Sequence, residues 1–103
     1  MDLYAVSRRN CWGSREELQT AAVRAIEEAA RRRDLRWVKS YVVDEQAGGL
    51  GMLCLYEAVS ADALWEHSGA AGLPCDEVVA VAAALVGREE PVRTRVGADG
   101  TRG

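Results

Sequence analysis

Three side chains that could carry chemistry lie close together in the middle of the chain. Cys54 offers a thiol, Glu57 offers a carboxylate, and His67 is the only imidazole in the sequence. Such groups bind metals, and they also serve as nucleophiles, general acids or general bases. The segment from Met52 to Pro74 therefore holds most of the candidate chemistry.

Each of these residues also fits a structural role. A lone histidine near a helix end is typical of a solvated or capping residue, and a cysteine between apolar neighbours is typical of a small buried side chain. Ala63 and Ala71 lie four residues either side of His67, so its own helix supplies no second ligand. Partners for His67 would have to come from Glu57, Cys75, Asp76, Glu77 or a second subunit.

The sequence lacks the more specific motifs of metal and phosphate sites. It contains no Cys-x-x-Cys pair and no His-x-x-x-His pair, and the glycines in residues 48–51 fall in a predicted hairpin. Dinucleotide-binding glycines stand between a strand and a helix, so these glycines do not indicate a phosphate site. A cysteine–histidine nucleophile would depend on the fold bringing the two residues together.

Aromatic residues suggest a different chemistry. Trp37, Tyr41 and Tyr56 can stack on an apolar ligand, and Met52 would complete such a cavity. His67 or Glu57 would then act as acid or base, as in small cyclases or cofactor-free monooxygenases. The alternative is that these rings are anchors of the core or of a dimer interface.

Composition limits the class of protein. The 103 residues suffice for one domain, with 49% hydrophobic residues and 28% charged residues. The net charge of −3 argues against a nucleic-acid partner, which normally meets a basic surface. No signal peptide and no membrane-spanning run is evident, and three cysteines do not indicate a disulfide scaffold. A cytoplasmic protein that does not bind membranes is expected.

The hydrophobic pattern predicts four strands and two helices. The strands are expected at Asp2–Ser7, Leu35–Val43, Met52–Ala58 and Asp76–Val86, with residues 81–86 also compatible with a helix. Ser14 and Glu17 form a capping box before a helix of about 20 residues. Ser60 caps the second helix, which is expected to bury Leu64 and Trp65 and to end at Gly72.

This order, βαββαβ, is the ferredoxin-like α+β plan: a four-stranded antiparallel sheet with two helices on one face. Strict alternation puts Trp37 and Tyr41 on one side of the second strand, and puts Met52, Cys54 and Tyr56 on one side of the third. Both sheet faces are apolar although the helices cover only one. A bare apolar face marks an interaction surface, so a homodimer with facing sheets is predicted, with a ligand cavity between them as a related alternative.

The domain is expected to span residues 1–86. Residues 87–103 are polar and rich in glycine, and a flexible or partner-dependent tail is predicted there.

Several of these segments together resemble a small bacterial family, once a domain of unknown function and now labelled nickel-binding. The similarity is carried by Trp37, residues 40–42, the run Cys54–Ala58, Glu66-His67 and residues 71–74. It implies a ferredoxin-like fold of the dimeric α/β-barrel type and binding of a divalent metal such as nickel, with no established catalysis. Cys54, Glu57 and His67 are the metal ligands that it implies. Relatives carry an acidic or histidine-containing end of the first strand, where this chain reads Ser-Arg-Arg-Asn-Cys-Trp-Gly.

Overall fold

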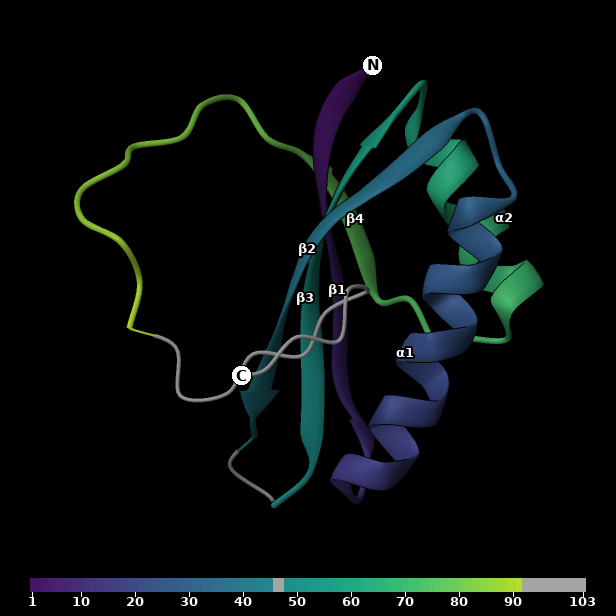
Figure 1. The fold of residues 1–103 in the computed structure, drawn as a ribbon, viewed down its shortest axis with the longest axis vertical. Coiled ribbons are helices and arrows are strands. Elements are labelled where there is room, and N and C mark those ends of the chain that lie inside the picture. Colours follow the sequence, from purple (N-terminus) through teal and green to yellow (C-terminus); the bar gives the residue numbers. More distant parts are fainter. Residues whose placement is uncertain (46–47, 92–103) are drawn as a thin grey trace.

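The computed structural model describes residues 1–45 and 48–91. Its elements are β1 (Asp2–Trp12), α1 (Arg15–Ala30), β2 (Leu35–Asp44), β3 (Leu50–Ala58), α2 (Ala61–Ala71) and β4 (Glu77–Ala80). The strands form one antiparallel sheet in the order β2-β3-β1-β4, and both helices cover the same face of it (Figure 1). The predicted ferredoxin-like βαββαβ fold is confirmed. In the described ranges, no helix is long and apolar enough to cross a membrane.

The inner face of the sheet, which carries the helices, holds the main core. Met52, Cys54 and Tyr56 of β3 all lie on this face, as predicted, and all three are buried. Val6 of β1 lies opposite Cys54, and Leu64 of α2 packs into the same cluster. The alternation of β3 thus separates this face from an outer face that no helix covers.

A bulge in β2 changes which aromatic residues share a face. The pairing of β2 with β3 passes over Val38, so the register shifts there by one residue. Trp37 lies opposite Tyr56 on the inner face, whereas Tyr41 lies opposite Leu53 on the outer face. The prediction that Trp37 and Tyr41 share one side is wrong, because strict alternation does not survive a bulge.

The helix termini follow their capping residues. Ser14 Oγ accepts a hydrogen bond from the Glu17 amide (3.2 Å), and the Glu17 carboxylate accepts one from the Gly13 amide (3.0 Å). α1 has 16 residues, fewer than the 20 expected. Ser60 caps α2, and Gly72 ends it with a φ of +69°, as the sequence indicates.

The buried side of α2 differs from the prediction. Leu64 is buried as expected, but Trp65 is 44% exposed. Ala63, His67 and Ser68 share the buried side with Leu64, because they recur three and four residues apart. Trp65 lies outside this stripe, so its predicted place in the core is wrong.

β4 is shorter than the predicted strand over Asp76–Val86. It pairs only with residues 4–7 of β1, and the amide of Val81 then donates a last hydrogen bond to Leu3 O (2.9 Å). β1 begins at Asp2, so its ladder offers almost no further partner. Residues 82–86 form neither strand nor helix. Of the predicted tail at 87–103, residues 92–103 lie outside the described part of the chain.

β1, in contrast, is longer than the predicted strand, which ended at Ser7. β3 begins at Leu50, two residues earlier than expected, and so provides partners as far as Trp12. Residues 8–12, which follow the predicted strand, are therefore also strand. An irregularity between Arg8 and Trp12 includes Asn10, whose φ of +51° is left-handed.

Gly51 lets β3 pass this irregular stretch at close range. A Cβ atom on Gly51 would lie 2.6 Å from the Arg8 carbonyl oxygen and 2.5 Å from Glu45 Oε2. Both distances are shorter than real Cβ contacts, and the first involves backbone, which cannot move aside without breaking the ladder. Residue 51 therefore needs to be glycine for reasons of space.

We predict that Gly51→Ala lowers the free energy of unfolding by about 2 kcal/mol or more, in the range of overpacked core positions. The measurement is urea denaturation followed by circular dichroism. Gly69→Ala is the matched control: Gly69 is exposed in α2 with nothing near its Cβ position, so alanine should stabilise the helix by about 1 kcal/mol. Equal effects of the two substitutions would contradict the steric argument.

Candidate functional site

An apolar groove of about 720 Å³ lies between α1 and the inner face of β2 and β3. This volume falls within the range of about 300–1,000 Å³ that is usual for small-molecule sites. α1 contributes Arg15, Glu16, Leu18, Gln19, Thr20, Ala22, Val23, Ala25 and Ile26, and the strands contribute Trp37, Ser40, Val42, Met52 and Tyr56.

Small side chains on α1 explain why the groove is open. Ala21 and Ala25 pack against Ala71 and Leu73, at and just beyond the end of α2, in a second buried cluster. Because the alanine side chains are short, α1 packs closely against the C-terminal end of α2. Ala22 and Ala25 of α1 also line the groove, and their short side chains leave space over the sheet. The groove is thus a consequence of the alanine-rich helix.

Two of the three predicted ligand-stacking residues meet in this groove. Trp37 and Tyr56 both line it, together with Met52. The indole Nε1 of Trp37 donates a hydrogen bond to Ser40 Oγ (2.9 Å), which satisfies its polar atom and holds the ring. Tyr41 lies on the outer face and does not line the groove. The pocket is therefore on the helix side of the sheet.

Close to Tyr56 lies a buried arginine, Arg8, one residue beyond the end of the predicted first strand. The Arg8 side chain is about 1% exposed. Its Nη1 donates to Ser68 Oγ (2.9 Å) and to the Pro74 carbonyl (2.7 Å), and its Nη2 lies 3.5 Å from Tyr56 Oη. The only sequence signal for this position is alternation: Arg8 follows Val6 by two residues and so shares its inward face.

The hydrogen-bond partners of the Arg8 guanidinium, Ser68, the Pro74 carbonyl and Tyr56, are uncharged, so its environment is unusual for a buried charge. Burial alone would lower its pKa, but the neighbouring Cys54 and Tyr56 outweigh burial and raise the pKa above its ordinary value. Nε of Arg8 has no hydrogen-bond partner in the described chain. Burial raises the pKa of Tyr56 to about 12, so its hydroxyl stays protonated at neutral pH.

His67 belongs to the same cluster and is fully buried, contrary to the expectation for a lone helical histidine. Its Nε2 lies 3.2 Å from Tyr56 Oη, and the two rings meet edge to face with centroids 5.4 Å apart. Burial, together with the nearby cations Arg8 and Arg32, lowers the pKa of His67 to about 4. The imidazole is therefore neutral at pH 7, and its Nδ1 has no described partner.

The three predicted metal ligands do not converge in one chain. Cys54 and His67 are both buried on the inner side of the sheet. Glu57 is three residues from Cys54 and lies opposite Leu3, on the outer face. Across residues 1–45 and 48–91, no group of three His, Cys, Asp or Glu side chains is close enough together to hold a metal ion.

The chemistry of this cluster does not suit nickel. Tyr56 bridges the one imidazole and the Arg8 guanidinium, so a divalent cation at His67 would be close to a buried positive charge in a low-dielectric interior. No carboxylate is among the hydrogen-bond partners given for Arg8, Tyr56 or His67. The residues present therefore do not fit the metal that the resemblance implies.

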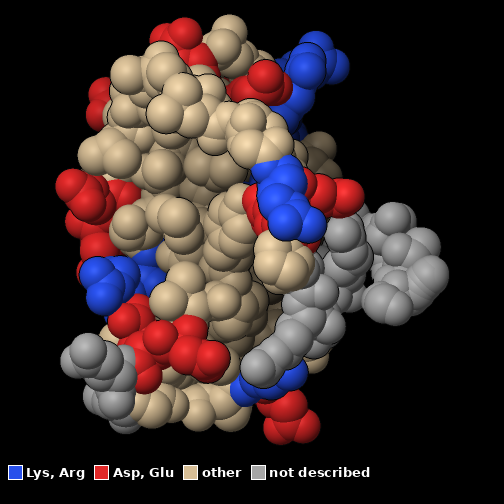
Figure 2. All heavy atoms as spheres, turned by 90° about the vertical axis from the view of Figure 1, so that its left-hand side faces the viewer, with Lys and Arg blue, Asp and Glu red and all other residues tan. Residues whose placement is uncertain are grey.

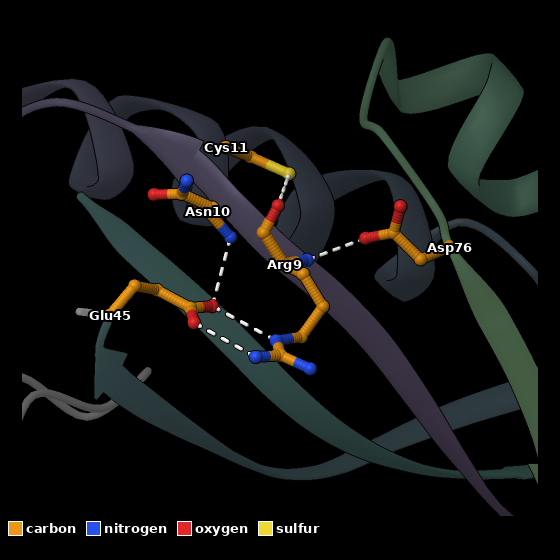
Figure 3. Close-up of polar contacts among 5 residues, drawn as sticks. All are labelled: Arg9, Asn10, Cys11, Glu45 and Asp76. Atoms are coloured by element: carbon orange, nitrogen blue, oxygen red, sulfur yellow. Dashed lines mark hydrogen bonds and ion pairs between the residues drawn. The ribbon is translucent and has the colours of Figure 1, made fainter. Parts of the chain in front are cut away.

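Acidic side chains also gather at the end of β1, as Figure 3 shows. Glu45 accepts hydrogen bonds from Arg9 Nε (3.1 Å), Arg9 Nη2 (3.0 Å) and the Asn10 amide (2.9 Å). Asp76 accepts one from the Arg9 amide (2.5 Å), and Cys11 Sγ donates to Arg9 O (3.0 Å). Arg9 holds the pKa of Glu45 below its ordinary value. This cluster joins the strand ends, and its arginine already neutralises Glu45.

The fold and the groove define a small ferredoxin-like protein with a pocket between one helix and the sheet. Residues 4–81 match the sequence profile of the family described as "Nickel responsive protein SCO4226-like", so the chain belongs to this family. The crystal structure of SCO4226 from Streptomyces coelicolor A3(2) is similar, with a TM-score of 0.64 and 21% sequence identity. The similarity covers 81% of this chain and 99% of that chain. No curated protein matches the sequence.

We predict a loss of stability on acidification that depends on His67. The unfolded state takes up a proton near the ordinary pKa of about 6.5, whereas folded His67 does so only near 4. The contribution is therefore complete above pH 6.5, declines as the pH falls, and is gone below pH 4. A shift of this size corresponds to about 3 kcal/mol.

The measurement is urea denaturation at several pH values between 4 and 7.5, with His67→Gln as the comparison. Carboxylates titrate in both proteins, so the difference between the two curves isolates the histidine. A difference that does not change with pH would show that His67 has an ordinary pKa in the folded protein.

Proposed function

We propose that this protein is a non-catalytic binding protein for a small, uncharged aromatic molecule, which lies in the groove between α1 and β2. The observation that carries this proposal is the groove itself, with Trp37, Met52 and Tyr56 among its lining residues. Trp37 is only partly buried, so its ring favours a flat aromatic ligand through stacked or edge-to-face contacts.

The charges around the groove support a neutral ligand. Arg15 and Glu16, its only charged lining residues in the described chain, carry opposite charges and are adjacent in sequence. The buried Arg8 does not line the groove. A charged ligand would lose its hydration on entering the apolar middle without gaining an opposite charge there.

The placement of the candidate acids and bases supports binding without catalysis. His67 is buried against Tyr56 and is not among the lining residues, and Glu57 lies on the other face of the sheet. A general acid or base must reach its substrate within hydrogen-bond distance. Neither residue meets that condition for a molecule in the groove.

The test is a fluorescence titration with N-phenyl-1-naphthylamine, an uncharged aromatic probe. Ala22→Leu should weaken its binding at least tenfold, because the longer side chain fills the groove from α1. Ala70→Leu is the matched control, since Ala70 is exposed on α2 outside the groove, and its affinity should stay within twofold of the parent. Equal binding by the two variants, or no binding by the parent, would refute the proposal.

Nickel binding is the second candidate function, and the family description is what favours it. Imidazole is a preferred ligand of nickel, and His67 is neutral at pH 7. However, its surroundings include a buried guanidinium and lack a third donor. We infer that any nickel binding by this chain does not depend on His67.

The experiment is a calorimetric titration of metal-stripped, untagged protein with nickel, alongside His67→Ala. We expect the two proteins to give the same heats. A nickel affinity that falls at least tenfold on substitution would restore His67 as a ligand and contradict the misfit described above.

A further inference from the structure

Residues 82–90, here called the arm, leave the sheet after β4 and extend away from the outer face (Figure 1). The arm begins with apolar residues, Ala82 to Val86. Leu85 is 99% exposed and Val86 is 88% exposed. Two adjacent large aliphatic side chains thus contact almost nothing within one copy.

The arm is nevertheless attached at both ends. It starts where Val81 bonds to β1, beside β4 at one edge of the sheet. It returns at Glu90, whose carboxylate accepts hydrogen bonds from Tyr41 Oη (2.6 Å) and Lys39 Nζ (3.2 Å). Lys39 and Tyr41 belong to β2, the opposite edge strand. The arm therefore spans the whole width of the sheet on its outer side.

The arm is also longer than this span requires. Four strands about 4.8 Å apart are about 14 Å wide, whereas the nine residue steps from 81 to 90 reach about 30 Å when extended. The excess length appears as the wide arc seen in Figure 1. A segment that only had to cover its own sheet would lie flat on it and bury its aliphatic residues.

The outer face has an apolar centre. By strand register, it carries Leu3 and Ala5 of β1, Leu53 and Leu55 of β3, and Val79 of β4. The charged residues of this face lie on the two edge strands or near the end of β3, and they are Arg36, Lys39, Glu57 and Glu77. Figure 2 looks toward this side of the molecule, with the arm in front of the sheet, and its central area shows few charged side chains. Leu53 is 36% exposed and Val79 is 44% exposed. An apolar sheet face of this kind is an interaction surface.

We propose that the arm closes over a second copy of this chain that is paired through the outer sheet face, with Leu85 and Val86 packed on that copy. A second copy brings an identical apolar face, and a twofold axis makes one surface complementary to itself. The uncharged stretch from Ala82 to Gly87 suits such a surface. The groove is on the other side of the sheet, so the arm does not compete with its ligand.

The arm is an addition to the fold that the comparisons describe. The family match ends at residue 81, where the arm begins. The similar crystal structure is covered over 99% of its length by 81% of this chain. The arm therefore supplies contacts that pairing through the sheet alone would not have.

The test is sedimentation equilibrium of the 103-residue chain, whose monomer mass is 11.2 kDa. The parent should have twice that mass. The double variant Leu85→Ser, Val86→Ser should dimerise at least tenfold more weakly. Ala83→Ser, Ala84→Ser is the matched control in the same arm, and its dissociation constant should stay within threefold of the parent. Because Leu85 and Val86 are exposed in one copy, their substitution should leave the monomer fold unchanged by circular dichroism.

A variant in the sheet separates the two parts of this proposal. Leu53→Asp places a charge in the outer face and should abolish pairing whether or not the arm contributes. If the parent protein is monomeric at all concentrations, both the proposed dimer and the proposed role of the arm are wrong. If the parent is dimeric and the arm variant dimerises equally well, the role of the arm is wrong but pairing through the sheets stands.

Discussion

The hydrogen bonds of the buried Arg8 guanidinium hold the candidate site together. They connect β1 with Tyr56 of β3, with Ser68 of α2 and with the Pro74 carbonyl before β4. A buried charge without such partners would cost several kcal/mol, so these elements must keep their relative positions. Tyr56 extends this constraint to the groove, because its ring lines the groove while its hydroxyl lies between Arg8 and His67.

The same cluster explains how a member of a nickel-responsive family can have an unsuitable interior for nickel. Its only histidine is neutral and buried beside a permanent cation. Family membership establishes the fold and a shared ancestry of these elements, whereas a metal site needs particular donors at particular distances. In this chain the inner space supports a pocket for a neutral molecule better than a site for a cation.

The two faces of the sheet differ in what covers them. The inner face buries the core and leaves the groove, because α1 contacts α2 through alanines and does not fill the space over β2. The outer face has an apolar centre, is covered by neither α1 nor α2, and is spanned by an arm with two exposed aliphatic residues. The proposed ligand site and the proposed pairing surface therefore lie on opposite sides of one small domain.

Local patterns in the sequence determined the order of elements, the capping of both helices at Ser14 and Ser60, the end of α2 at Gly72, and the shared face of Met52, Cys54 and Tyr56. Each depends on neighbours within a few residues, so each is visible in the chain itself. The fold class followed from that order. Trp37 and Tyr56 were also found as candidate ligand contacts, because large aromatic residues on strands are easily recognised.

Only the tertiary structure decided the rest. The bulge at Val38 moved Tyr41 to the outer face, and the pairing of β1 with β3 beyond Ser7, where Arg8 lies opposite Met52, placed Arg8 in the core. The partner strand, which is distant in sequence, sets the length and register of both strands. The burial of His67 and the separation of Glu57 from Cys54 arise in the same way. Burial, register and the distance between donors are properties of packed elements, and no local pattern in the sequence contains them.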